Sequence, residues 1–265
     1  VQALYARLWS SAFLPSQHQG TSFQVVGDPV LFLSNPGGID AKVRRRMLDS
    51  LAQLNRKHQT EIGDPEIATT IAQQEMAFRM QTSVPELMDV SNEPKHVLDL
   101  YGKDAMRKGS FAHNCLIARR LSERGVPFVQ LFHRGWDQHG SLPSKIRQQC
   151  EDVDQPAAAL VRDLKQRGML DDTLVLFTTE FGRTPFAQSG SDKVGPGRDH
   201  NKYGFSCWLA GGGVKAGFSY GQTDEIGWKT VENPVHWHDF HATVLHLMGV
   251  DHKKLSFYHN GIERR

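Results

Sequence analysis

The sequence predicts an α/β protein in which helices cover both faces of a doubly wound, mostly parallel sheet. Two observations lead to this fold class. Short, continuous apolar runs at 126–132, 173–179 and 205–210 alternate with segments of amphipathic helical pattern, as parallel strands and their crossover helices do. Polar and charged residues flank these runs, at the sheet edge where such folds bind their ligands.

The first part of the chain is expected to be loop followed by two helices. Residues 1–38 are rich in Gly, Pro and Ser, with one candidate strand at 30–33. Within 40–58 the spacing of one helix face is followed by the apolar residues Val43, Met47, Leu51 and Leu54. Asp64-Pro65 begins the next helix, because Asp caps a helix and Pro suits its first turn. We expect this helix to end near Met80.

Three further helices are expected later in the chain. Each has apolar residues at helical spacing and is closed by a glycine, the residue that most often ends a helix. They are 110–124, 143–167 and 238–248, followed by Gly125, Gly168 and Gly249. We expect residues 1–265 to form a single domain. Within it, 1–108 is a mostly helical and loop insertion region and 109–265 is the α/β core.

Composition excludes several classes of protein. Hydrophobic residues make up 39% and charged residues 23% of the 265 residues, which is typical of folded proteins rather than disordered ones. The net charge of +2 gives no reason to expect a nucleic-acid partner. No apolar run approaches the roughly 20 residues of a membrane-spanning helix. The composition predicts no oligomeric state.

The residues at the ends of the predicted strands suggest a metal site. Nine of the 13 histidines lie at or after His133, and histidine is the commonest metal ligand. Asp137 and His139 follow the first strand, Glu180 follows the second, and His200 precedes the third. We therefore predict that Asp137, His139, Glu180 and His200 bind a divalent cation such as Zn²⁺, Mn²⁺ or Ca²⁺.

Arginines lie in the same segments. Arg134, Arg183 and Arg198 are candidates for binding a tetrahedral oxyanion, because guanidinium groups form paired hydrogen bonds with such anions. Asp199 beside them is a further candidate for substrate binding. Each of these residues alone is more simply explained as a helix cap or a surface ion pair. The prediction rests on their convergence at one sheet edge.

Two other patterns are better explained by structure than by chemistry. The run His236-Trp237-His238-Asp239-Phe240-His241 resembles a zinc site, but His238 or Asp239 is expected to cap the helix that starts there. Cys115 and Arg119 have the spacing of a C-x-P-x-R sulfatase nucleophile motif without its proline. This cysteine lies in a predicted amphipathic helix, where a thiol is usually buried and inert.

Longer motifs resemble a known family. GWDQHG, EFGRTP, GRDH and ENPVHWHDFHATVLHLMGVDH are similar to a large bacterial family of domains of unknown function in the alkaline phosphatase/sulfatase superfamily. The resemblance implies a metal site in which Glu180 keeps a carboxylate and Phe181 replaces a histidine. It also implies an exported protein of which this chain is the carboxyl-terminal portion. The superfamily's nucleophile has no counterpart here, so no catalytic nucleophile is assigned.

Two functions follow from these observations. The first is a metal-dependent hydrolase of sulfate or phosphate esters, carried by a small molecule or a polysaccharide. The alternative is a non-catalytic relative that keeps the sulfatase fold as a binding or scaffold module. A nucleic-acid binder has no support, because the sequence contains neither a recognition motif nor a basic stripe.

Overall fold

The computed structural model describes residues 11, 19–24, 27–30, 33–188 and 196–264. It divides the chain into two compact units with the boundary between Glu93 and Pro94, rather than at the expected subdivision after residue 108. The candidate strand at 30–33 lies partly outside the described residues.

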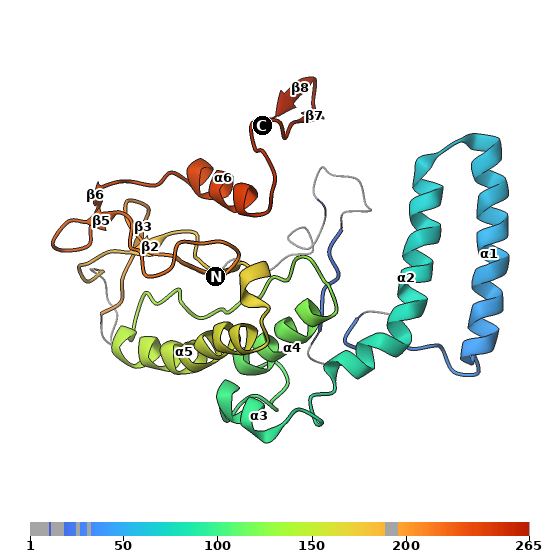
Figure 1. Ribbon diagram of the computed structural model, residues 1–265, viewed down its shortest axis with the longest axis horizontal. Helices are drawn as coiled ribbons and strands as arrows, with labels where there is room; N and C mark the ends of the chain where they lie inside the picture. The colour runs from blue at the N-terminus through green and yellow to red at the C-terminus, as the bar shows by residue number, and fades with distance from the viewer. Residues whose placement is uncertain (1–10, 12–18, 25–26, 31–32, 189–195, 265) are drawn as a thin grey trace. The chain divides into compact units, whose positions relative to one another are not determined.

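The first unit is a helical hairpin. Helix α1 (Ala41–Ile62) begins at Asp40, whose side chain accepts a hydrogen bond from the backbone N–H of Val43. Helix α2 (Pro65–Met88) is capped in the same way by Asp64, and the two helices pack side by side (Figure 1). The sequence predicted that this helix ends near Met80. Helix α2 instead continues through Pro85 to Met88. Proline thus costs this helix a backbone hydrogen bond without ending it.

The second unit begins with three packed helices. Helices α3 (Lys95–Tyr101), α4 (Phe111–Glu123) and α5 (Leu142–Gln166) contact one another. Helix α4 confirms the helix predicted at 110–124, and helix α5 confirms the one predicted at 143–167. Their shared core contains Tyr101, Leu116 and Leu164, each at most 1% exposed. This helical core is followed by a short 3-10 helix, η3 (Leu170–Asp172).

The rest of the unit consists of short strands and one helix. Within the described residues the strands form antiparallel pairs: β1 (Val175–Phe177) with β4 (Trp208–Ala210), β2 (Gly182–Arg183) with β3 (His200–Asn201), β5 (Gln222–Thr223) with β6 (Thr230–Glu232), and β7 (Phe257–His259) with β8 (Ile262–Arg264). Helix α6 (Trp237–Leu247) lies between β6 and β7 in the chain and confirms the helix predicted at 238–248.

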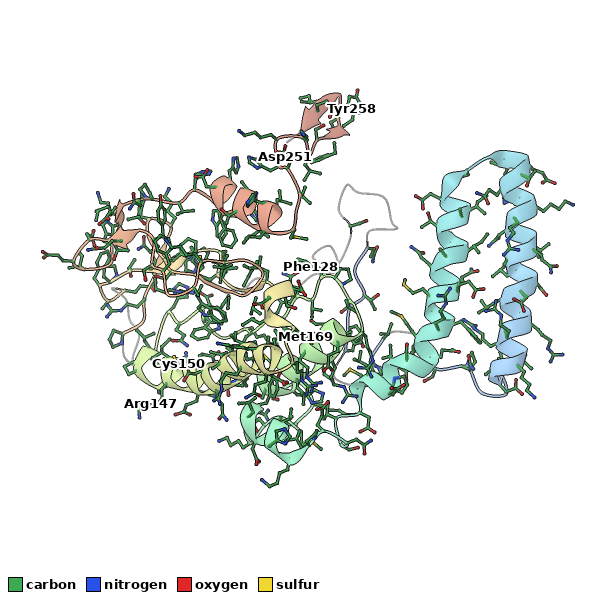
Figure 2. The ribbon with its side chains drawn as sticks, in the orientation of Figure 1. Phe128, Arg147, Cys150, Met169, Asp251 and Tyr258 are labelled. Atoms are coloured by element: carbon green, nitrogen blue, oxygen red, sulfur yellow. The ribbon has the colours of Figure 1, made fainter. Side chains whose placement is uncertain are left out.

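The predicted strands differ from these pairs in part. The strands at 173–179 and 205–210 correspond to β1 and β4, but they pair antiparallel, with Val175 opposite Ala210. Residues 126–132 form no strand, and Phe128 among them, labelled in Figure 2, is 67% exposed. No parallel pair occurs among the described strands. The doubly wound, mostly parallel sheet that the sequence suggests therefore has no support from these strand pairs and stays a prediction.

Candidate metal centre

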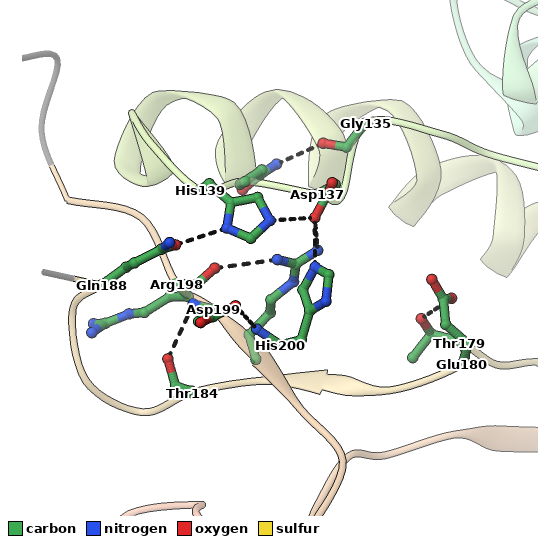
Figure 3. A network of polar contacts seen from close by, with 12 residues as sticks. Gly135, Asp137, His139, Thr179, Glu180, Thr184, Gln188, Arg198, Asp199 and His200 are labelled. Atoms are coloured by element: carbon green, nitrogen blue, oxygen red, sulfur yellow. Dashed lines mark hydrogen bonds and ion pairs between the residues drawn. The ribbon is translucent and has the colours of Figure 1, made fainter. Parts of the chain in front are cut away.

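The candidate site is assembled by one strand pair and one loop. Arg183 of β2 lies directly opposite His200 of β3, and residues paired in this way project from the same face of the ladder. The loop before α5 brings Asp137 and His139 to that face (Figure 3). Strand register therefore decides which side chains face Asp137.

Three side chains converge on one carboxylate oxygen. Oδ1 of Asp137 lies 2.9 Å from Nε2 of His139 and 3.0 Å from Nε2 of His200. Nη2 of Arg183 donates a 2.7 Å hydrogen bond to the same oxygen. The three atoms able to bind a cation, from Asp137, His139 and His200, all lie within 4.8 Å of one another. The geometry thus brings together three of the four predicted metal ligands.

Neighbouring side chains orient the two imidazoles. Nδ1 of His139 lies 2.7 Å from Oε1 of Gln188, so it donates its proton to that amide oxygen. The ring of His200 stacks on Phe181 with 4.2 Å between the ring centroids. Partners of this kind fix the tautomer and the direction of a metal-binding histidine. Gln188 and Phe181 therefore direct Nε2 of both imidazoles toward Asp137.

The hydrogen bond between His139 and Gln188 favours a positive charge between Nε2 of His139 and Oδ1 of Asp137. Because Nδ1 donates to Gln188, a neutral ring would present its Nε2 lone pair to the anionic oxygen of Asp137. A proton or a metal cation between these two atoms removes that repulsion. Hydrogen bonds from the Arg183 guanidinium and the His200 imidazole lower the pKa of the Asp137 carboxyl. The carboxylate is therefore ionised at neutral pH and available to a cation.

Gly197 allows the two halves of the site to meet. A Cβ atom at this position would overlap the carbonyl group of His139 and the backbone nitrogen of Gly140. The close approach is held by a hydrogen bond from the backbone N–H of Arg198 to the carbonyl oxygen of Gln138, 3.1 Å long. Only glycine lets the GRDH segment pass the Asp137–His139 loop at this distance.

The other predicted site residues lie outside this convergence. Glu180 accepts a 3.0 Å hydrogen bond from Thr179, and Figure 3 shows it apart from Asp137 and both imidazoles. The side chain of Arg198 points away from Asp137 in the same view, and Arg134 is exposed. Asp199 accepts a hydrogen bond from the backbone N–H of His200. Arg183 is therefore the predicted arginine that reaches the site.

Sequence reasoning missed Gln188 and Phe181 as supporting residues. Phe181 appeared only as a substitution relative to the resembling family, while the structure places its ring against a candidate ligand. Its position between Glu180 and Gly182, where β2 begins, was the available signal. Gln188 lies 49 positions from His139 in the chain, and no spacing pattern connects the two residues.

The two patterns assigned to structure agree with that assignment. His236 is the N-cap of α6, and the Asp239 carboxylate accepts a hydrogen bond from its backbone N–H. Asp239 thus caps this helix, as expected, together with His236 rather than His238. Cys115 is 1% exposed within α4, and burial raises the pKa of its thiol to about 12. This thiol is protonated at neutral pH and is therefore a poor nucleophile.

None of the helices described by the structure has an apolar stretch long enough to cross a membrane.

Comparisons with known proteins identify the family of the chain. Searches of curated proteins and of solved structures find no match. The model of one family, described as "Protein of unknown function (DUF1501)", matches residues 1–265. The chain therefore belongs to this DUF1501 family.

Proposed function

We propose that the chain provides a single divalent-metal site in a hydrolase of sulfate or phosphate esters. The observation that carries this proposal is the convergence of two imidazole Nε2 atoms on one carboxylate oxygen, at 2.9 and 3.0 Å. Around a tetrahedral Zn²⁺ ion, ligand atoms are about 3.3 Å apart, given bonds of roughly 2.0–2.1 Å. Small movements of Asp137, His139 and His200 therefore suffice to admit a cation.

The donor set favours certain metals. Two imidazoles and one carboxylate suit Zn²⁺ or Mn²⁺, whereas Ca²⁺ prefers a shell of oxygen ligands. Three protein ligands are also the number found in catalytic zinc sites, in which the fourth position is open to water or substrate. The side chains of His139 and His200 are 40% and 46% exposed, so this position faces solvent.

Arg183 has the geometry of a substrate-binding residue. Its Nη2 donates a 2.7 Å hydrogen bond to Oδ1 of Asp137, and its Nη1 donates a 3.2 Å hydrogen bond to the carbonyl oxygen of Arg198. Together these two hydrogen bonds fix the plane of the guanidinium group. A bound cation would polarise the ester and lower the pKa of a bound water. Arg183 would then share the carboxylate with the cation and donate hydrogen bonds to the anionic oxygens of the ester.

The resemblance supports the class of reaction. GWDQHG contributes Asp137 and His139, EFGRTP contributes Arg183, and GRDH contributes His200. Each of these motifs thus contributes to the convergence described above. We propose on this basis that the chain is a distant relative of the alkaline phosphatase/sulfatase superfamily and hydrolyses the same class of ester.

One observation favours the alternative of a non-catalytic binding module. Oδ1 of Asp137 already accepts a hydrogen bond from the Arg183 guanidinium, so this carboxylate is neutralised without a metal. Phe181, which stacks on His200, stands where the resembling superfamily supplies a further histidine ligand. A chain that kept only the ion pair would bind anions at this site without hydrolysing them.

Metal titration tests the proposal. Isothermal titration with Zn²⁺, Mn²⁺ and Ca²⁺ is expected to show one Zn²⁺ or Mn²⁺ ion per chain. His139→Ala should abolish this binding, whereas His252→Ala, at an exposed position outside the site, should leave it unchanged. The absence of stoichiometric binding at micromolar metal would overturn the proposal.

Turnover separates the two functions. Metal-loaded protein is expected to hydrolyse p-nitrophenyl sulfate or p-nitrophenyl phosphate, and Asp137→Asn should abolish this activity. Binding of metal and inorganic sulfate without turnover of either ester would instead support the non-catalytic module.

A further inference from the structure

Strands β2 and β3 form a pair with two different faces. Arg183 lies opposite His200, whose imidazole faces Asp137. Gly182 lies opposite Asn201, and because successive residues of a strand project to opposite sides, Asn201 points away from the site. The side chain of His200 is 46% exposed, whereas Asn201 is 1% exposed. The strand pair therefore has an open face that carries the candidate site and a covered face that carries Asn201.

The chain that follows β3 fills the covered face. A Cβ atom at Gly182 would overlap the carbonyl oxygen of Gly204 and would lie 2.9 Å from Cβ of Phe205. Glycine at position 182 thus lets residues 204 and 205 come this close to β2. Asn201 shares this face with Gly182 and is enclosed by protein, so its amide has backbone groups as partners.

Both ends of the Asn201 amide bind backbone groups. Its Nδ2 donates a 2.9 Å hydrogen bond to the carbonyl oxygen of Trp228, and its Oδ1 accepts a 3.0 Å hydrogen bond from the backbone N–H of Tyr203. The first bond joins β3 to the turn between β5 and β6, and the second fixes the chain where it leaves β3. Strand β3 is therefore held at the residue next to His200.

The turn that receives the Asn201 bond is held by hydrogen bonds of its own. The Asp224 carboxylate accepts hydrogen bonds from the backbone N–H groups of Trp228 at 2.7 Å and Lys229 at 3.1 Å. The backbone N–H of Thr230 donates a 2.9 Å hydrogen bond to the carbonyl oxygen of Tyr203. Asn201 thus connects β3 to a turn whose conformation is fixed at several points.

We propose that Asn201 is a positioning residue for the candidate metal centre. It lies on the covered face and acts by holding β3 so that Nε2 of His200 stays 3.0 Å from Oδ1 of Asp137. The pairing of β3 with β2 places Arg183 on the same side as His200, so both side chains depend on this support. The inference rests on the proposed function, because that proposal makes His200 a metal ligand. Residues that orient metal ligands typically contribute about ten- to a hundredfold to metal affinity.

Metal affinity and coordination geometry of Asn201→Ala test the proposal. We expect this variant to bind Zn²⁺ about tenfold more weakly than the original protein in a competition titration. Co²⁺ bound in place of Zn²⁺ should show shifted or weaker visible absorption bands, because these bands depend on the arrangement of the ligands. The control is Val97→Ala, which removes two methyl groups from a side chain of α3 that is 4% exposed. It should lower the free energy of unfolding and leave both metal measurements unchanged.

A second variant keeps the test informative if Asn201→Ala does not fold. Asp224→Ala removes the acceptor of the Trp228 and Lys229 N–H groups and should weaken Zn²⁺ binding in the same direction. Unchanged Zn²⁺ affinity and Co²⁺ spectrum in Asn201→Ala, or in Asp224→Ala if the first variant does not fold, would overturn the proposal. Equal weakening of Zn²⁺ binding by Val97→Ala would also overturn it, because the effect would then follow from lost stability.

A measurement on metal-free protein separates this proposal from the proposed function. The rings of Phe181 and His200 stack with 4.2 Å between their centroids, so NMR should show nuclear Overhauser contacts between their protons. These contacts should weaken or vanish in Asn201→Ala. If they do so while the original protein binds no metal, the proposed function fails and the positioning role of Asn201 remains. If they persist in Asn201→Ala, the positioning role is wrong, whatever the metal titration shows.

Discussion

The ring of Phe181 stacks on the imidazole of His200, with 4.2 Å between their centroids and 30° between their planes. This contact holds the imidazole with Nε2 directed at Asp137. Aromatic contacts of this kind contribute about 0.5–1.5 kcal/mol. Phe181→Ala is therefore expected to weaken Zn²⁺ binding about two- to tenfold in a competition titration. Phe218→Ala is the matched control, and an unchanged Zn²⁺ affinity in Phe181→Ala would contradict this positioning role.

Replacement of Gly197 should separate the two halves of the site. Gly197→Ala places a Cβ atom on the backbone of His139 and Gly140, and relief of such overlap costs about 1–3 kcal/mol. We expect metal affinity to fall at least tenfold and the free energy of unfolding in urea to decrease by that amount. Gly37→Ala, where no atom lies within 4 Å, serves as control. Full metal affinity in Gly197→Ala would show that the segments need not approach so closely.

Replacement of the buried Asp163 should lower the free energy of unfolding more than replacement of an exposed charged residue. Its carboxylate, 3% exposed, lies 3.1 Å from Nε of Arg119 and 2.7 Å from Nε of Arg167, and accepts a 3.1 Å hydrogen bond from Tyr101. Removal of one member of a buried ion pair leaves its partner unpaired and costs about 3–5 kcal/mol. Asp163→Ala is expected to lose this much stability in urea unfolding.

An exposed ion pair provides the control for Asp163. Nζ of Lys95 lies 2.6 Å from Oδ2 of Asp99 on the surface. Exposed ion pairs of this kind contribute less than about 1 kcal/mol to the free energy of unfolding. Lys95→Ala should therefore change the free energy of unfolding by less than this amount. Equal effects of the two substitutions would mean that burial does not determine the strength of the Asp163 network.

Acid should destabilise the protein partly through His113. This side chain is 1% exposed, and burial lowers its pKa, a shift partly offset by its hydrogen bond with the carbonyl oxygen of Ala105. An unfolded histidine gains a proton below about pH 6.5, whereas the folded one resists protonation. Stability is thus complete above this pH and decreases as the pH falls below it.

The contribution of His113 can be measured by comparison of two pH values. Between pH 7.5 and 5.5 the loss attributable to this residue is at most about 1.4 kcal/mol. His113→Asn should show a correspondingly smaller decrease in the free energy of unfolding than the original protein. Equal pH dependence of the two proteins would assign the acid sensitivity to other groups.

The three thiols should react at different rates. Burial raises the pKa of Cys115 to about 12, so almost no thiolate is present at pH 8. Cys150 and Cys207 are exposed, although partial burial also raises the pKa of Cys207. Ellman's reagent at pH 8 is expected to label Cys150 fastest, then Cys207, and Cys115 only after unfolding in urea. Rapid labelling of three thiols in the folded protein would contradict the burial of Cys115.

Periodicity predicted the helices well but not their partners. The sequence indicated one apolar face of the first helix, with Met47, Leu51 and Leu54, yet these side chains are 40–66% exposed. Leu48 and Ala52 on a neighbouring face are buried instead. Spacing along a helix identifies its apolar residues, while the position of the second helix decides which of them are covered.

The candidate site was predicted in part for a similar reason. Asp137, His139 and His200 stand at the ends of predicted strands, and their chemistry made them recognisable. Glu180 has the same chemistry, but its side chain turns to Thr179, which no pattern of residue types reveals. Gln188 and Phe181 act through contact with the imidazoles, so only coordinates identify them.

The residues that meet at Asp137 are distant in the chain, since Arg183 lies 46 positions away and His200 lies 63 positions away. A cation bound between Asp137 and His200 would act as a reversible cross-link that closes this long loop, and binding to the folded state alone raises the melting temperature. Resistance of this region to heat and proteolysis should therefore follow the concentration of available metal, and chelators should lower it.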